Sequence, residues 1–502
     1  MEGMDSQYGG RWGCRDTVES NSYTISSSSG TFSTAYTSAS DSRMSPAEAA
    51  ATHSDVVWEQ VVDKKGRAKC LAQEFFAGNG SIDGAGDMHV MEKWFTQLGV
   101  EWVIRPVAGE LHHHTLSNAA RQWSRVLDEI DSSMTGLFVD SYWEISEIAG
   151  MDVVSAWEKE LDVTESETQV DSSTIVRLQL ARFIHEAMLR MCPFVDYIVA
   201  LNPIHGVPGL YDMLDALLHV HGALSTALRL PSTRSVASSE LKRVHGEMVS
   251  LLTEKQGKAG EAVWTTMEEI WTRILKSVDT DDSWRDPKGS SGIHKLTIFL
   301  TSYIKLLYTH HWSVAPIVSE AVRLGNYVAR IDSNRPFRCL IIETNMFLEE
   351  KLAQMSLLFP DQSFRFLFLV NNSYFIWEEL TELRDFVWES HMEYSVPSKI
   401  ENYLQSYLHV SWAPVLSCLS CNTTFFLGRS TPLCKFESEF MRTYTTQKLW
   451  KVPDPTMRGM LRKAIVERVV PEYRKYMENN NVTTPRITLQ ELEEMLQELF
   501  EG

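Results

Sequence analysis

Apolar side chains recur every three or four positions along most of this chain, and that spacing constrains the fold more than any other feature. It is clearest at 335–380, where one apolar stripe ends at Pro360-Asp361 and a second apolar segment follows. Because proline cannot continue a helical hydrogen-bond ladder, we expect two antiparallel helices joined by a tight turn. The first stripe comprises Ile341, Met346, Phe347, Leu348, Leu352, Met355 and Phe359.

Two adjacent asparagines, Asn371 and Asn372, lie inside the second segment of this helical hairpin. Asparagine is a poor helix former, so its presence there needs a reason. A buried amide must find hydrogen-bond partners. The sequence therefore predicts that this pair bonds across to a neighbouring helix.

The same helical period continues on both sides of the hairpin. Helices are predicted over 58–76, 88–98, 119–130, 175–201, 209–228, 239–277, 293–328 and 397–421. We expect prolines to interrupt two of them, at Pro193 and at Pro316. No strand-like alternation competes with the helical period, so the predicted fold class is all-α.

Capping residues predict two further helices near the end of the chain. Asp454 supplies a side-chain acceptor, and Pro455 suits the first helical position. That helix is expected to run to Val470, before the next proline. Thr488 and Glu491 have the spacing of a capping box, which predicts the start of the last helix.

The chain has 502 residues, 44% of them hydrophobic, which is enough for several packed cores. The segment 1–55 is rich in Ser, Thr and Gly, and it cannot bury enough apolar surface to offset its ordering entropy. We predict a disordered tail, either phosphorylated and regulatory or a passive leader. An acidic stretch with Pro and Gly at 279–292 marks a second boundary. The predicted helical bundles are therefore 56–292, the N-terminal part, and 293–502, the C-terminal part.

Charge and cysteine usage exclude some classes of partner. The chain carries 66 Asp and Glu against 47 Lys and Arg, so nucleic acid is not an expected partner. Its seven cysteines have no framework spacing, which favours reduced thiols in the cytosol. No stretch reaches the roughly twenty apolar residues of a transmembrane helix, so we expect any membrane contact to be peripheral.

Histidines and cysteines are the main candidates for metal chemistry. The three histidines at 112–114 would point in different directions on a helix, and Cys418 and Cys421 lack a complete ligand set nearby. His219 and His221 are interpreted as structural, because paired histidines without a further ligand at the right spacing rarely bind a metal. We therefore expect no metal and no cofactor. No P-loop, HExxH or nucleophile-elbow motif is present, which predicts that the protein is not an enzyme.

Several short runs match the pattern of one known family. They are Leu348–Lys351, Phe368–Asn372, Tyr403–Leu416, Trp450–Pro455 and Leu499–Gly502. Together they resemble the Exo-seventy subunit family of the exocyst, plant type, and the likeness is densest over 293–502. The exocyst tethers secretory vesicles to the plasma membrane. The resemblance implies an elongated rod of consecutive antiparallel helical bundles.

The resemblance also implies a function. It predicts a helical scaffold in exocytosis that tethers vesicles through protein contacts and weak phosphoinositide contacts. An exocyst-independent adaptor in plant immunity, with tethering lost, is the alternative. The implied partners are other exocyst subunits, a Rho-type small GTPase or an immune receptor, and an anionic membrane. The implied location is the cytoplasm, with peripheral association with the plasma membrane.

Two departures from the family pattern bear on assembly. Lys295 follows the first histidine of the family signature, where members usually carry proline. The Ser-rich segment stands where members carry an N-terminal coiled coil that packs against sister subunits. A buried heptad seam normally supplies such an interface. The chain therefore resembles a shortened, divergent member, and we expect weak or no incorporation into the exocyst.

Lipid contact in the family depends on basic residues of the C-terminal region. The stretch 448–475 contains eight basic and three acidic residues. On a helix Arg458 and Arg462 align one turn apart, whereas Lys463 and Arg468 point elsewhere. Thr483 stands where the family has the first lysine of a lipid-binding pair, and Arg486 matches the second. Glutamates crowd the last helix, so we expect weaker phosphoinositide binding than in a typical member. The candidate phosphoinositide-binding residues are Lys451, Arg458, Arg462, Lys463, Arg468, Arg474, Lys475 and Arg486.

Overall fold

The structure is a computed structural model. All the residues that it describes belong to one compact unit, Trp58–Gly502. The described residues are 67–77, 87–103, 116–131, 172–201, 206–228, 239–280, 292–383, 395–420, 431–482 and 484–502. The predicted tail at 1–55, the three histidines at 112–114, Cys421 and Thr483 lie outside these residues.

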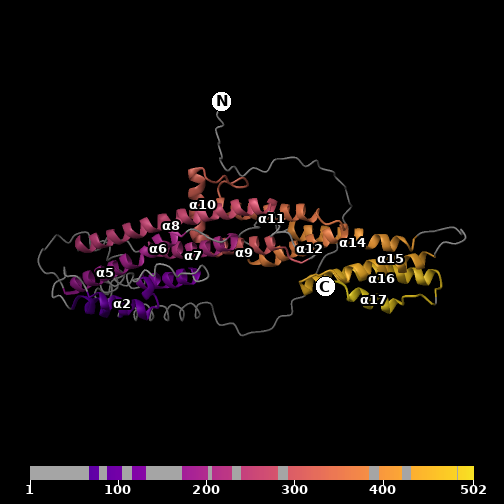
Figure 1. Cartoon of the computed structure of the whole chain (residues 1–502), viewed down its shortest axis with the longest axis horizontal. Coiled ribbons are helices and arrows are strands. Elements are labelled where there is room, and N and C mark those ends of the chain that lie inside the picture. The colour runs from indigo at the N-terminus through magenta and orange to yellow at the C-terminus, as the bar shows by residue number, and fades with distance from the viewer. Residues whose placement is uncertain are drawn as a thin grey trace, which may run out of the picture. The chain divides into compact units, whose positions relative to one another are not determined.

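Helices make up almost all of the described chain (Figure 1). Two helices at 67–77 and 116–131 accompany α2 (Met88–Gln97), α5 (Ser172–Met191), α6 (Pro193–Ala200), α7 (Gly206–Ala227), α8 (Ser239–Thr280), α9 (Lys295–Thr309), α10 (His311–Leu324), α11 (Pro336–Ser356), α12 (Gln362–Glu379), α14 (Ser395–Ser417), α15 (Pro432–Gln447), α16 (Pro455–Asn479) and α17 (Leu489–Gln497). Short 3-10 helices lie at Glu101–Val103 and Thr381–Leu383. Within these ranges the extended structure is limited to one isolated bridge, between Lys451 and Glu501. The all-α prediction is confirmed.

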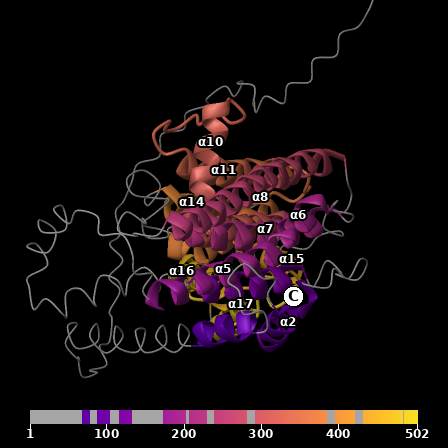
Figure 2. The ribbon, with the colours of Figure 1, turned by 90° about the vertical axis from the view of Figure 1, so that its left-hand side faces the viewer.

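The helices pack in succession along the chain. α8 lies along α7 and also contacts α5 and α6, and α7 and α8 lie side by side in both views (Figures 1 and 2). α10 joins this group to α11, which packs on α9 and α12. α12 then packs on α14, α14 on α15 and α16, and α16 on α17. The prediction of consecutive helical bundles is thus confirmed, because each group contacts the next one along the chain.

The predicted helical hairpin is present and separates two hydrophobic clusters. α11 and α12 pack against each other across a short turn, and the Asp361 carboxylate caps α12 by accepting from the N–H groups of Ser363 and Phe364. The first cluster spans 68–383 and includes Phe368, whereas the second spans 367–500 and includes Leu367. α12 therefore contributes side chains to both clusters. The division into bundles at 292 stays a prediction.

The two asparagines of α12 bond to other segments, as predicted. Asn372 is fully buried, and its Oδ1 accepts from the His294 N–H at 2.9 Å and the Thr297 hydroxyl at 2.7 Å. Its Nδ2 donates to the Phe368 carbonyl at 2.9 Å. The Asn371 amide donates to the Lys451 carbonyl at 3.2 Å. Asn372 thus ties the start of α9 to α12, whereas Asn371 ties α12 to the segment before α16.

Other local predictions also agree with the structure. α5 ends at Met191 and α6 begins at Pro193, so proline divides the predicted helix there. The Asp454 side chain accepts from the Met457 N–H at 2.7 Å and caps α16. Both halves of the predicted capping box are made at the start of α17. These features depend only on residues close in sequence.

Two proline predictions are wrong. The chain between α9 and α10 breaks at His310, and Pro316 lies inside α10. α16 continues past Val470 to Asn479 with Pro471 inside it. An internal proline removes one backbone hydrogen bond and costs about 3 kcal/mol. Both helices nevertheless bury apolar side chains on each side of the proline, and that packing keeps them continuous. The buried neighbours are Val314, Ile317 and Val318 in α10, and Val469, Val470 and Tyr473 in α16.

The prediction that Met346 belongs to the apolar stripe of α11 is also wrong. Met346 is 54% exposed, whereas Ile341, Leu348 and Leu352 are buried. Met346 directly precedes Phe347 and Leu348, so it lies off the axis of the stripe.

Across the part of the chain that the structure describes, no helix is both long enough and apolar enough to cross a bilayer.

Candidate functional site

The basic residues at 448–475 come from α16 and the segment that precedes it. Arg458 and Arg462, one helical turn apart, both pair with the carboxylate of Glu501. Arg462 also donates from Nε to the Leu499 carbonyl at 2.9 Å. These hydrogen bonds, led by the one from Arg462, hold the pKa of Glu501 below its ordinary value. Glu501 therefore occupies the place where these two candidate arginines converge.

Three other basic residues of this stretch also face glutamates. Lys448 Nζ lies 2.6 Å from a Glu498 carboxylate oxygen, and this hydrogen bond lowers the pKa of Glu498. Lys463 lies 3.9 Å from Glu467. Arg474 lies 3.8 Å from Glu493 of α17. Exposed ion pairs of this kind contribute at most about 1 kcal/mol each, so the lysines and arginines can exchange partners readily.

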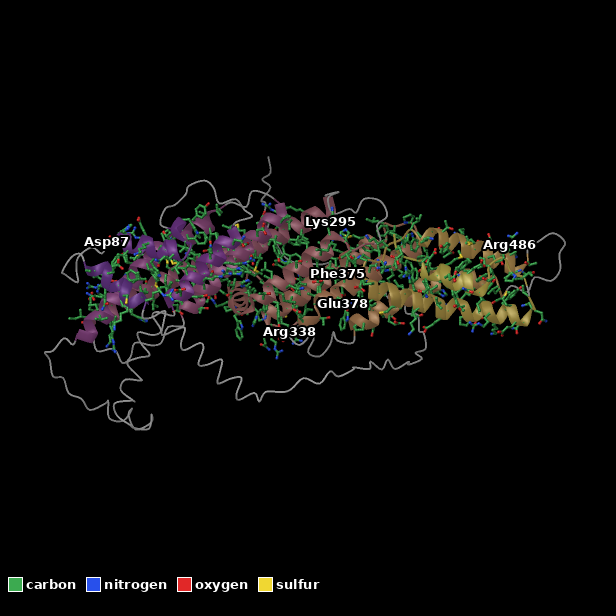
Figure 3. All side chains as sticks on the ribbon, turned by 90° about the horizontal axis from the view of Figure 1, so that it is seen from below. Asp87, Lys295, Arg338, Phe375, Glu378 and Arg486 are labelled. Carbon is green, nitrogen blue, oxygen red and sulfur yellow. The ribbon has the colours of Figure 1, made fainter. Side chains whose placement is uncertain are left out.

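Of the remaining candidate residues, Lys451 is the one that the structure places beside the arginine pair. Arg468 and Lys475 have no carboxylate partner among the described residues. Arg486 is exposed beside the helices of the second cluster (Figure 3), and its backbone N–H donates to Glu437. Lys451 is exposed and bridges to Glu501 through its backbone. The structure thus brings Lys451, Arg458 and Arg462 together around Glu501.

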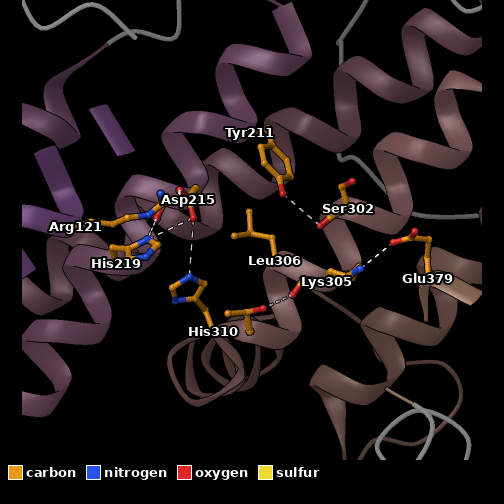
Figure 4. A pocket seen from close by; sticks show the side chains of 10 residues that line it. Arg121, Tyr211, Asp215, His219, Ser302, Lys305, Leu306, His310 and Glu379 are labelled. Carbon is orange, nitrogen blue, oxygen red and sulfur yellow. Dashed lines mark hydrogen bonds and ion pairs between the residues drawn. The ribbon is translucent and has the colours of Figure 1, made fainter. Parts of the chain in front are cut away.

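A second candidate site was not anticipated from the sequence. It is a polar pocket of about 530 Å³ between α7, helix 116–131 and the junction of α9 and α10 (Figure 4). Its lining residues are Arg121, Tyr211, Asp215, His219, Ser302, Lys305, Leu306, Thr309, His310 and Glu379. Asp215 is the most buried of the charged lining residues discussed below, with 7% of its surface exposed.

The Asp215 carboxylate contacts residues from three segments. Oδ2 accepts from Arg121 Nη2 at 2.8 Å. Oδ1 lies 3.4 Å from His219 Nδ1 and 4.0 Å from His310 Nε2. The two imidazole rings meet edge to face with centroids 4.6 Å apart. His219 Nδ1 also donates a hydrogen bond to the Asp215 carbonyl oxygen at 2.8 Å.

Burial and neighbouring charge set the pKa values in this pocket. Burial alone would raise the pKa of Asp215, but the hydrogen bond from His219 and the charges of His219 and Arg121 outweigh it and lower the pKa. Burial would lower the pKa of His219, but its bonds to Asp215 raise it instead. Burial, reinforced by the charge of His219, lowers the pKa of His310 to about 4. The carboxylate is therefore charged and His310 is neutral near neutral pH.

The interpretation of the two α7 histidines needs one correction. His221 is a buried core residue, as expected, and burial lowers its pKa to about 4. His219 does have a carboxylate at ligand spacing, because Asp215 lies four residues earlier and on the same helical face. The contact between Asp215 and His219 could therefore have been predicted from their spacing in the sequence. The contribution of His310, 91 residues away from His219, had no such signal.

These observations define an all-α protein built from consecutive helical bundles, with paired charges near the end of the chain and a polar pocket lined by α7 and the junction of α9 and α10. Residues 152–498 match the family model for the C-terminal part of Exo70, a component of the exocyst complex. The match covers more than half of the chain, and the chain therefore belongs to the Exo70 family.

Individual relatives and solved structures resemble the chain at low identity. It is 24% identical over 295 residues to the exocyst complex component EXO70C1 of Arabidopsis thaliana, covering 51% of this chain and 43% of the relative. It is 28% identical over 251 residues to EXO70E2 of the same plant, covering 46% of this chain and 38% of the relative. A solved structure of S. cerevisiae Exo70 aligns over 88% of this chain and 98% of that chain, with 12% identity and a TM-score of 0.36. The chain covers less than half the length of these curated relatives.

Proposed function

We propose that this protein is a helical scaffold of the exocyst type, which acts in exocytosis by holding other proteins near the plasma membrane. The observation that carries the proposal is the family match over residues 152–498, which includes most residues of both hydrophobic clusters. A scaffold needs extended, stable helical surfaces, and the succession of helices packed on their neighbours supplies them. Its proposed partners are other exocyst subunits.

Co-purification tests the scaffold proposal. The full chain is tagged, expressed in its own cells and captured under mild salt, and the bound proteins are identified by mass spectrometry. We expect exocyst subunits to be recovered above a tag-only control but in substoichiometric amounts, because the sequence predicts weak incorporation. Capture of a defined set of other proteins without any exocyst subunit would contradict exocyst assembly and support an adaptor with a different role.

The proposal includes a weak phosphoinositide contact on the basic surface around Glu501. Each basic residue near an anionic membrane contributes about 1 kcal/mol of binding free energy. Here Glu501 pairs with Arg458 and Arg462, and Glu498 pairs with Lys448, so part of the positive charge is already neutralised. This pairing supports weak rather than strong lipid binding.

Glu501→Gln is expected to strengthen binding to anionic vesicles about fivefold, because it removes one negative charge between two arginines, worth about 1 kcal/mol. Arg462→Ala should weaken binding. The measurement is co-sedimentation with phosphatidylcholine vesicles that do or do not contain a phosphatidylinositol bisphosphate, at physiological salt.

A matched control separates the site from net charge. Glu478→Gln makes the same charge change on an exposed position of α16, away from the arginine pair. It should leave vesicle binding nearly unchanged. Equal gains for Glu478→Gln and Glu501→Gln would show that only net charge matters and would reject the site around Glu501.

A further inference from the structure

We propose that Asp215, His219 and His310 bind a divalent first-row transition metal, for which Zn²⁺ is the test ion. One ligand atom from each of these residues lies within 4.8 Å of the other two. Two imidazoles and one carboxylate are a typical ligand set for zinc, with a fourth position left to water. The pocket in front of them provides room for that water (Figure 4).

The spacing of the donor atoms is close to that of a zinc site. Zinc–ligand bonds of about 2.0 Å in a tetrahedron separate ligand atoms by roughly 3.3 Å. Asp215 Oδ1 lies 4.0 Å from His310 Nε2, and one ligand atom of His219 lies within 4.8 Å of the ligand atoms of both residues. A side-chain movement of less than about 1 Å at the junction of α9 and α10 brings the distance between Asp215 and His310 into the range of a tetrahedral site.

The hydrogen bonds around the three ligands leave suitable lone pairs available. His219 donates its Nδ1 proton to the Asp215 carbonyl, which leaves the lone pair on Nε2. Metal-binding histidines commonly donate their other N–H to a backbone carbonyl in this way. The imidazole of His310 makes no hydrogen bond among the described residues, and it is largely buried beside Asp215 Oδ1. A metal ion bound between the two histidines would be coordinated by this nitrogen of His310.

Arg121 affects the strength of such a site without blocking it. Its guanidinium bonds to Oδ2 of Asp215, so Oδ1 stays directed at the two histidines. That bond orients the carboxylate, although the positive charge weakens the attraction for a dication. Mg²⁺ and Ca²⁺ prefer ligand sets made of oxygen, so neither should compete. A bound ion would join α7 to the junction of α9 and α10.

Metal titration of the full chain tests the proposal. The run at 112–114 is first changed to alanine in every variant, because three adjacent histidines would add a background site. After dialysis against a chelator, Zn²⁺ binding is followed by calorimetry, and Co²⁺ binding by its visible absorption. We expect one site whose Co²⁺ spectrum shows tetrahedral bands without the thiolate charge-transfer band that cysteine ligands would produce. Mg²⁺ should give no binding signal.

Two substitutions at one position make the result decisive. His310→Gln should weaken Zn²⁺ binding at least about tenfold, whereas the neighbouring control His311→Gln should not change it. His310→Cys replaces one metal ligand by another, so it should retain binding and add a thiolate band to the Co²⁺ spectrum. The same affinity in wild type and His310→Gln, or no new band in folded His310→Cys, would overturn the proposal.

Discussion

Replacing Asn372 by leucine is expected to lower the free energy of unfolding by about 3 kcal/mol, because two buried donors lose their acceptor. Those donors are the backbone N–H of His294 and the hydroxyl of Thr297, both bonded to Asn372 Oδ1. Leucine has a similar volume, so the loss comes from unsatisfied polar groups and not from a cavity. We expect the damage to be centred where α9 meets α12.

A double-mutant cycle isolates this contribution. Thr297→Val alone should cost about 1 kcal/mol, because Asn372 keeps its other donor. In the Asn372→Leu background the same change should cost almost nothing, since it removes a hydroxyl that is already unsatisfied. An equal cost in both backgrounds would show that the two side chains do not interact.

Urea denaturation measures the change in stability, and hydrogen exchange of the 292–301 peptide locates it. Asn402→Leu is the matched control, because Asn402 is an exposed asparagine of α14. A surface substitution of this kind should change stability by less than about 0.5 kcal/mol. Faster exchange at 292–301 is expected only in the Asn372 variant.

Phe500→Ala is expected to lower the free energy of unfolding by about 4 kcal/mol, because it removes a fully buried aromatic ring from the second hydrophobic cluster. The ring packs edge to face with Tyr407, at a centroid distance of 6.3 Å. Its backbone carbonyl also accepts from the Val452 N–H at 3.2 Å. Phe500 therefore anchors the segment that carries Glu501 to the arginine pair.

The backbone at Phe500 allows a sharper comparison. Its φ is +69°, in the left-handed region, which costs residues with a side chain roughly 1–2 kcal/mol. Glycine adopts this conformation without that cost. Phe500→Gly should therefore be no less stable than Phe500→Ala, although glycine is the smaller residue and is usually the more destabilising one.

Thermal unfolding of the two variants tests this order of stability. If glycine proved clearly worse than alanine, the left-handed backbone at this position would not be a source of strain. Both variants should also release Glu501 from the arginine pair. Binding to anionic vesicles should then rise in both, in the same direction as in Glu501→Gln.

Features that depend on residues close in the chain could be predicted from the sequence alone. The helical period, the break at Pro193 and the caps at Asp454 and Thr488 were all predicted and are all present. The need of Asn372 for partners outside its own helix was also predicted, although the partners were not. Such features arise from backbone hydrogen bonding and side-chain periodicity within one or two helical turns.

Features that depend on residues far apart in the chain could not be predicted from the sequence, because they arise from the packing of whole helices. Pro316 and Pro471 stay inside helices because buried neighbours hold those helices against other elements. Arg458 meets Glu501 from 43 residues away, and Asp215 meets His310 across the junction of α9 and α10. Local patterns carry no information on which helix faces which, since that choice is made by the packing of whole apolar surfaces. The convergence of these charged groups is therefore a consequence of packing.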